Sequence, residues 1–202
     1  MGMVLLLLAT SATAMAGDGD AILSRIKAAH KDVATIESSF THERTTARGK
    51  KSVRNGIFYY VDSTRQMAMR YSNPSSMYFI VSNGHLYNGL NKIPLHFNMK
   101  RNAIMRALGN AMVWAVRGDV QNIIDDNNVD TRIYEEEGFY VISMTARNGF
   151  NRGITRIVLK YEKSHCLLRH MEVEEIIKVN HVFLLGNDTK TNRPVDAKRF
   201  VL

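Results

Sequence analysis

Residues 66–88 read QMAMRYSNPSSMYFIVSNGHLYN, and this stretch decides the fold that the sequence predicts. Its beginning alternates, with Met67, Met69 and Tyr71 on one face of a strand and small or polar residues on the other. A proline then breaks this strand, and the Asn-Gly pair further on is a strong signal for a tight hairpin. The stretch predicts three consecutive antiparallel strands, at Gln66–Ser72, Met77–Val81 and His85–Asn88.

The same period of two continues outward from this stretch. We expect further strands at Ser39–Thr46, Val53–Val61, Val129–Glu135, Phe139–Ala146, Gly153–Glu162, Leu167–Glu175, Ile177–Leu185 and Lys198–Leu202. Two regions have a helical period instead, Asp20–Ile36 and the span from Asn98 to Asp125, where Gly118 is expected to end or kink the helix. Antiparallel strands interrupted by helices predict an α+β fold with one dominant sheet.

The first sixteen residues read MGMVLLLLATSATAMA, a short apolar core followed by a small-x-small pattern at Ala14-Met15-Ala16. This pattern is typical of a signal peptide cleaved before Gly17. We therefore expect 1–16 to be a signal peptide and 17–202 to be a single domain of a soluble, monomeric periplasmic protein. A buried N-terminal helix is the alternative interpretation.

The formal net charge is +8, and the basic residues are scattered along the chain instead of forming one run. Such a charge favours an acidic partner or an anionic membrane surface, and export argues against nucleic acid. Cys166 is the only cysteine, so an internal disulfide is excluded, and a small buried hydrophobe is its expected role.

Motifs for catalysis or metal binding are missing. The sequence has no HExxH, P-loop, GxSxG or GxGxxG motif. His165 and His170 fall on a predicted strand where they would point to opposite faces, and a His165–Cys166 pair would diverge for the same reason. The acidic run at 125–128 lacks the spaced ligands of a calcium loop. We expect a protein that is not an enzyme and uses no cofactor or metal, with an exported hydrolase as the alternative.

The remaining candidates for a functional site are apolar residues, among them many methionines. Methionine is flexible and can repack around ligands of different shape, so methionines on a concave sheet would suit acyl chains, although an ordinary core is the competing interpretation. The expected cavity residues are Phe58, Tyr60, Met67, Met69, Tyr71 and Ile80.

The apolar face of the central helix carries Ile104, Leu108 and Met112. This helix is either a lid over the cavity or a fixed core helix. Gly109 and Gly118 would lower its stability, which favours the lid.

The order of these segments resembles the LolA family of periplasmic outer-membrane lipoprotein carriers, over nearly the whole mature chain. The final similar segment, Asn192–Phe200, is the most specific. The others are the N-terminal helix leading into Ile36–Phe40, then Gly56–Phe58, Tyr71–Pro74, Val81–Tyr87 and the central helix.

The resemblance implies an incomplete β-barrel with helices as a lid and a hydrophobic cavity for acylated lipoproteins, without a cofactor. It also implies an inner-membrane ABC transporter (LolCDE-like) as donor and an outer-membrane receptor lipoprotein (LolB-like) as acceptor. Met67 and Met69 correspond to apolar strand residues of the family, one of them at the cavity mouth. A carrier or sensor of another lipid or lipoprotein, on the same fold, is the alternative.

The sequence departs from the family pattern at the lid. Familiar members carry Arg-Pro before the third strand, and the arginine bonds the lid. Here the stretch is Asp62-Ser63-Thr64-Arg65, so whether Arg65 replaces that arginine stays open.

Overall fold

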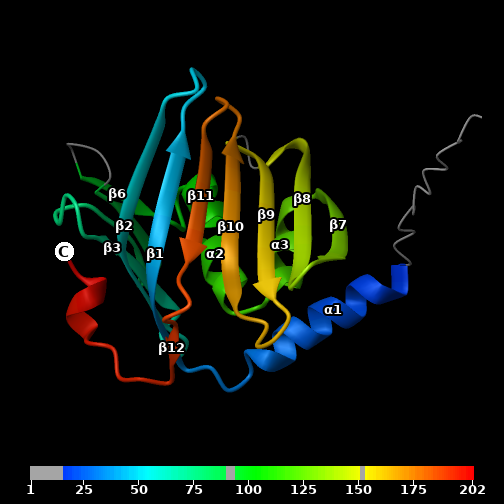
Figure 1. The fold of residues 1–202 in the computed structure, drawn as a ribbon. Coiled ribbons are helices and arrows are strands. Elements are labelled where there is room, and N and C mark those ends of the chain that lie inside the picture. The colour runs from blue at the N-terminus through cyan, green and yellow to red at the C-terminus, as the bar shows by residue number, and fades with distance from the viewer. Residues whose placement is uncertain (1–15, 90–93, 151–152) are drawn as a thin grey trace, which may run out of the picture.

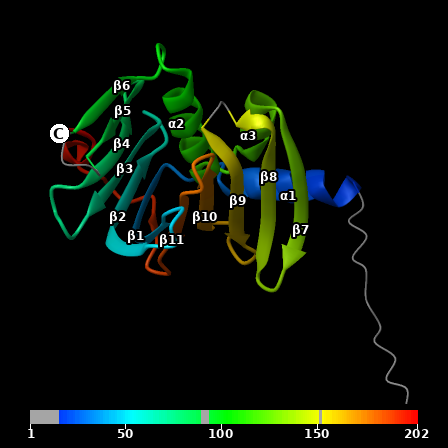
Figure 2. The ribbon, with the colours of Figure 1, turned by 90° about the horizontal axis from the view of Figure 1, so that it is seen from above.

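One strongly curved antiparallel sheet forms the body of the protein (Figures 1 and 2). The computed structural model describes residues 16–89, 94–150 and 153–202. Strand order along the twelve-stranded sheet is β6-β5-β4-β3-β2-β1-β11-β10-β9-β8-β7, with β12 paired to β1. Among the described residues, the edge strands β6 and β7 do not pair with each other, so the barrel is incomplete, as predicted. The strands are β1 Thr35–Thr45, β2 Lys51–Val61, β3 Gln66–Tyr71, β4 Tyr78–Ser82, β5 His85–Asn88, β6 Leu95–Asn98, β7 Val129–Glu136, β8 Phe139–Phe150, β9 Ile154–Glu162, β10 Leu168–Glu175, β11 Asn180–Leu185 and β12 Lys190–Thr191.

The three α-helices of the described residues lie on the concave side of the sheet and at one end of it. Figure 2 shows α2 and α3 inside the curve, and Figure 1 shows α1 crossing the lower end. Their bounds are α1 Ala16–Ala29, α2 Ala103–Val116, α3 Val120–Asn127 and the short 3-10 helix η1 Ala197–Phe200. Within the described residues, none of the helices combines the length and apolar character needed to cross a bilayer.

The two central helices follow from local signals in the sequence. Asn102 caps α2, because its side-chain oxygen accepts a hydrogen bond from the Met105 backbone N–H at 3.0 Å. Gly118 separates α2 from α3 with φ +70°, and a Cβ there would lie 2.8 Å from the His30 ring. The glycine therefore supplies both a left-handed turn and the close approach of α1. The predicted break at Gly118 is confirmed, and a separate helix, α3, follows it.

Two element predictions are wrong. The helix expected over Asp20–Ile36 ends at Ala29, and Ile36 already lies in β1. The apolar residues near the end of the predicted helix fit the strand period as well as the helical one. The strand expected over Lys198–Leu202 is instead η1, where the Asp196 side chain caps the Lys198 N–H at 2.9 Å. The short strands β6 and β12 were not expected. The predicted signal peptide, residues 1–16, lies outside the described residues except for Ala16.

The sheet has apolar residues on both faces. The main core fills the concave side and joins residues of the sheet to α1, α2 and α3. A second, small cluster lies on the convex side, where η1 covers β2, β3 and β4 with the buried Phe200. Its other buried members are Tyr59, Ala68 and Ile80.

Candidate functional site

The concave face of β2, β3 and β4 is built from alternating large apolar residues. Antiparallel pairing sets Phe58 opposite Met69 and Tyr60 opposite Met67. It also sets the two methionines opposite Phe79 and Val81 on β4. Because side chains of one face recur every second residue, pairing aligns them in rows across the strands. These side chains are nearly or fully buried and belong to one cluster with the inward face of α2.

A cavity of about 110 Å³ remains between α2 and this face. Its apolar lining comes from six elements, and three polar residues close one end. A void of about 10 Å³, close to the room for a single water, lies nearby between Met112 and the methionines of β3. The 110 Å³ cavity is lined by Tyr71, Phe79, Leu108, Met112, Ile154, Val173 and Phe183, with Asn88, Glu175 and His181 at its polar end.

A chain of hydrogen bonds leads from the cavity wall to that polar end. The Tyr71 hydroxyl lies 2.9 Å from Nδ1 of His42, and Nε2 of His42 lies 2.9 Å from Nδ1 of His181. Nε2 of His181 is 3.1 Å from Glu175 Oε1. Desolvation, followed by unfavourable charge interactions with His181, Arg54 and Arg44, lowers the pKa of His42 to about 3, and burial raises the pKa of Tyr71. Both groups are therefore neutral at neutral pH.

The C-terminal end of α2 is held more firmly than its start. The Tyr161 hydroxyl donates a hydrogen bond of 2.6 Å to the Ala115 carbonyl. Arg117, which caps the helix, forms ion pairs with Asp62 at 2.7 Å and Asp119 at 3.2 Å. At the other end, Ile104 is 39% exposed, and the next apolar turn, at Leu108, is only partly buried. The helix is thus anchored at one end and loosely covered at the other.

An ion pair between Asp62 and Arg117, and not a contact of Arg65, joins the β2–β3 turn to the end of α2. Arg65 is exposed in the β2–β3 turn and has φ 51°. The ion pair between this turn and α2 is made by Asp62 on the sheet side and Arg117 on the helix side. The residue on the sheet side of this contact is therefore an acid, where the family pattern that the resemblance implies has an arginine.

Most of the predicted cavity residues come together. Tyr71 lines the 110 Å³ cavity, and Phe58, Met67 and Met69 line the smaller void. Tyr60 lies on the same face, but its hydroxyl turns away and donates to Asp62 at 2.7 Å. The placement of Ile80 was wrong: it lies in the convex cluster under η1.

Ile80 was misplaced because β4 carries apolar residues on both faces, so only its register with β3 tells the faces apart. Of the predicted lid residues, Leu108 and Met112 line the cavity and Ile104 does not.

Sequence reasoning missed the half of the cavity contributed by β4, β9, β10 and β11. Phe79, Ile154, Val173 and Phe183 all line it. The alternation of apolar and polar residues in β10 was visible, but local periodicity does not say which strands lie across the hollow from one another.

A larger hollow of about 280 Å³ lies at the opposite end, between α1, the end of β2 and the α2–α3 turn. Charged side chains, including Lys27, Lys31, Asp62 and Arg117, line it, and the last two pair with each other. Because several charged side chains line this hollow and would have to lose water to an acyl chain, it is a poor site for one.

The residues considered for catalysis do not form a catalytic arrangement. Cys166 is buried, and desolvation raises the pKa of its thiol. His165 is exposed and contacts Ser164 and Glu162 instead of the thiol. Among the residues that the structure describes, no group of three or more His, Cys, Asp or Glu side chains is placed to hold a metal ion.

Comparison with known proteins gives no match to any family model and no match among curated proteins. Solved structures do match. An outer membrane lipoprotein-sorting protein domain, so described, from Vibrio parahaemolyticus is 11% identical, with a TM-score of 0.50 over 92% of this chain and 97% of that one. An uncharacterized conserved protein from Thermus thermophilus is also 11% identical, with a TM-score of 0.50 over 90% and 91%.

A LolA superfamily protein from Nitrosomonas europaea is 10% identical, with a TM-score of 0.45 over 91% of this chain and 97% of that one. Identities this low carry information about fold alone. The chain therefore has the LolA-like fold, an incomplete antiparallel β-barrel with helices in its hollow.

Proposed function

We propose that this protein is a periplasmic carrier that binds the acyl chains of lipoproteins beneath α2 and shuttles them from the inner to the outer membrane. The observation that carries the proposal is the 110 Å³ cavity between α2 and the concave sheet, whose lining is mainly apolar. A small number of polar groups at one end of an apolar cavity is the usual composition of a ligand site.

Loading requires α2 to move. Ligand pockets usually measure about 300 to 1,000 Å³, so a cavity of about 110 Å³ is too small for an acyl chain. The start of α2 is exposed at Ile104, whereas Tyr161 and Asp62 hold its C-terminal end. The helix would therefore pivot about the end near Arg117 and open the cavity at Leu108 and Met112.

The same helix would limit affinity. Each CH₂ of an acyl chain gains about 0.8 kcal/mol on leaving water, so a permanently open site would hold several chains too tightly for release. In the closed state, Met112 and its neighbours on α2 occupy the space against β3. Because closing the helix competes with cargo, the net affinity falls and transfer to an acceptor becomes feasible.

The donor and acceptor in this proposal are an inner-membrane ABC transporter (LolCDE-like) and an outer-membrane receptor lipoprotein (LolB-like). The predicted signal peptide and the segment order shared with the LolA family support this placement. A second candidate is a carrier or sensor of another lipid on the same fold. The polar end of the cavity favours it, because a lipid with a polar headgroup would meet Glu175 and His181 there.

Replacing Val173 with tryptophan tests the cavity directly. Val173 is 4% exposed and lines the cavity, so the larger ring would fill much of the space that an acyl chain needs. Binding of a triacylated cysteine lipopeptide, followed by native mass spectrometry, should fall at least about tenfold in Val173→Trp, since overpacking adds to the lost volume. A phospholipid offered in the same assay tests the second candidate, because a carrier of another lipid would bind it.

The control is Val182→Trp, which places the same ring on the outward face of the neighbouring strand β11, since Phe183 points inward. It should bind like the wild type. Undiminished lipopeptide binding by a folded Val173→Trp protein would show that the acyl site lies elsewhere.

A further inference from the structure

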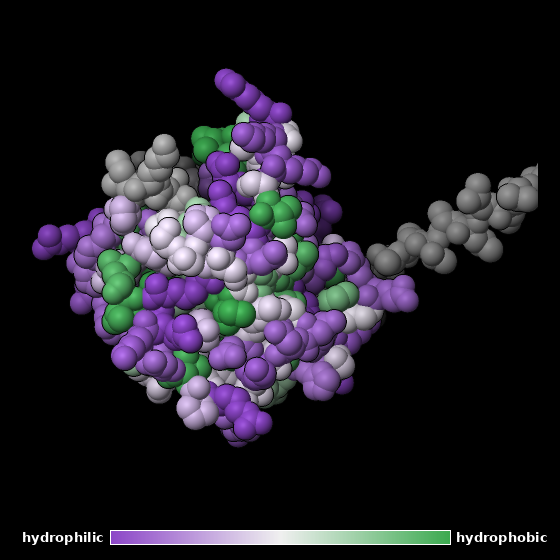
Figure 3. Space-filling model, turned by 60° about the vertical axis from the view of Figure 1, so that its left-hand side comes forward, coloured by the Kyte–Doolittle hydropathy of each residue, from purple (hydrophilic) through white to green (hydrophobic). Residues whose placement is uncertain are grey.

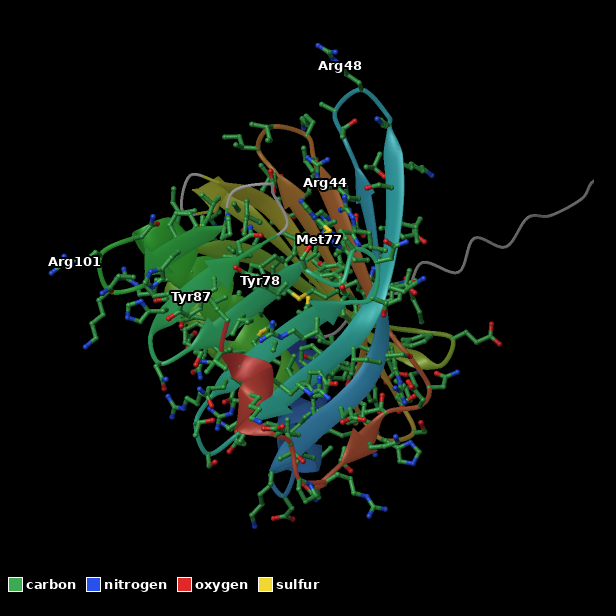
Figure 4. The ribbon with its side chains drawn as sticks, turned by 90° about the vertical axis from the view of Figure 1, so that its left-hand side faces the viewer. Arg44, Arg48, Met77, Tyr78, Tyr87 and Arg101 are labelled. Carbon is green, nitrogen blue, oxygen red and sulfur yellow. The ribbon has the colours of Figure 1, made fainter. Side chains whose placement is uncertain are left out.

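The hairpin that joins β1 and β2 is strongly basic. Between residues 44 and 54 it carries Arg44, Arg48, Lys50, Lys51 and Arg54, against no acidic residue in the same stretch. Figure 4 shows Arg48 at the protruding tip and Arg44 lower down, on the side of the hollow. In the described part of the chain, none of these five side chains lies within ion-pair distance of a carboxylate. Their positive charge is therefore available to a partner.

The neighbouring hairpin, between β10 and β11, exposes aliphatic side chains at its turn. Ile176 is 54% exposed and Ile177 is 64% exposed. Turns normally consist of glycine, proline and small polar residues, so two adjacent β-branched apolar residues are out of place there unless they contact something. Val53 on the outer side of β2 adds a third aliphatic residue, at 60% exposure.

The two hairpins project from the same end of the molecule. Thr45 lies opposite Asn180 in the pairing of β1 with β11, so both turns begin at the same level of the sheet. Figure 1 shows both tips at the upper end, and Figure 3 shows hydrophobic residues beside hydrophilic ones on the part that protrudes there. The cavity reaches the same end through Glu175 and His181, which lie just below the β10–β11 turn.

We infer that these two hairpin tips form a docking surface for an anionic lipid bilayer. Exposed lysines and arginines would meet the lipid phosphates, while Ile176 and Ile177 would enter the headgroup boundary, the combination found in peripheral membrane-binding elements. Because both tips project from one end, they can reach a flat bilayer together. Docking at this end would bring the cavity opening to the membrane.

Vesicle binding of the mature protein, without cargo, tests this surface. We expect binding to vesicles of equal parts phosphatidylglycerol and phosphatidylcholine, weakening with added salt, and little binding to phosphatidylcholine alone. Each basic residue near an anionic surface is worth about fivefold in affinity, so Arg48→Gln/Lys50→Gln/Lys51→Gln should bind roughly a hundredfold more weakly.

The matched control is Lys31→Gln/Arg132→Gln/Arg193→Gln. These three residues are also exposed and lie away from the tips, and their substitution removes the same amount of positive charge. The control should keep nearly wild-type affinity. An equal loss in both triple variants would show attraction by net charge alone and would overturn the proposal, as would wild-type protein that stays unbound to the anionic vesicles.

The aliphatic part of the surface has its own test. Ile176→Ser/Ile177→Ser should lower vesicle affinity about tenfold at high salt, where charge is screened and apolar burial dominates. Val201→Ser/Leu202→Ser removes two residues that are 57% and 72% exposed at the C-terminus and should have no effect. If these two variants bind the vesicles with equal affinity, Ile176 and Ile177 are not part of the docking surface. None of these outcomes depends on acyl binding in the cavity, so this proposal and the proposed function can fail separately.

Discussion

His42 is a buried titratable group on the concave face of β1. It is 1% exposed, stacks on Phe183 with ring centroids 4.3 Å apart, and bridges Tyr71 to His181. Both of its ring nitrogens have partners, so the neutral side chain satisfies its hydrogen-bonding capacity at little cost. A second ring proton would create a buried charge with His181, Arg54 and Arg44 nearby, so desolvation first and like charge second explain the low pKa.

This low pKa predicts a pH-dependent stability. Unfolded His42 titrates near 6.5, and the folded pKa is about 3, so the unfolded chain binds more protons between these values. The stabilisation is fully present above pH 6.5 and is lost as the pH falls toward 3, by at most about 1.4 kcal/mol per pH unit. His42→Gln, which cannot titrate, should flatten this part of the profile in urea unfolding. Identical slopes for the two proteins over this range would contradict the assignment.

At the scale of elements, the open question is whether α2 is a movable lid or a fixed core helix. Gly109 was expected to loosen the helix, but it also has a packing role. A Cβ at this position would lie 2.8 Å from the Met99 Cε atom and 3.5 Å from a Val81 methyl group. The glycine therefore lets α2 approach β4 closely, and helix propensity alone does not establish a mobile lid.

A cross-link at this contact separates the two roles. With Cys166 replaced by Ser, Val81→Cys/Gly109→Cys would place two thiols across the contact between α2 and β4, since the flexible end of Met99 can move aside. Oxidation should abolish lipopeptide loading without lowering stability, and reduction should restore it. Hydrogen exchange should also show that lipopeptide speeds exchange across Ile104–Val116. If the oxidised protein loads as fast as the reduced one, α2 is fixed core and the entrance lies elsewhere.

At the scale of the whole molecule, the open sheet and its ends set where ligands and partners can reach. The anchored end of α2 faces α1 and the charged hollow, whereas the cavity and both exposed hairpin tips lie toward the opposite end. The loosely covered start of α2 belongs to the cavity side as well. The proposed ligand exchange and the proposed membrane docking therefore concern the same end of the molecule, and the ion pairs that anchor α2 lie at the other.

The N-terminus yields a prediction for the whole chain. Cleavage after Ala16 would remove one residue of α1, whose first buried side chains are Ile22 and Leu23. The mature protein should therefore begin at Gly17 and unfold at the same urea concentration as the uncleaved chain. The intact mass of protein exported from its own gene measures the start. Recovery of the chain with Met1 attached would favour the buried N-terminal helix instead.

Much of the strand pattern and the break between α2 and α3 follow from the sequence alone. Alternation of apolar and polar residues, together with the Asn-Gly turn, placed the strands from 66 to 88, because these signals act between near neighbours. Asn102 and Gly118 likewise bound α2 through their own side chains or backbone angles. The half-barrel itself was implied only by the resemblance of this segment order to the LolA family.

Only the tertiary structure decided which side chains share the cavity. Ile80 and Phe79 are equally apolar in a short strand, and pairing with β3 turns one to each face. The hydrogen bond between His42 and His181 joins residues 139 positions apart through the pairing of β1 with β11. The basic residues of 44–54 are already neighbours in the sequence, but only that same pairing brings them beside Ile176 and Ile177. Local periodicity fixes the face of a strand but not its partner, so such non-local constellations exist only once the sheet has formed.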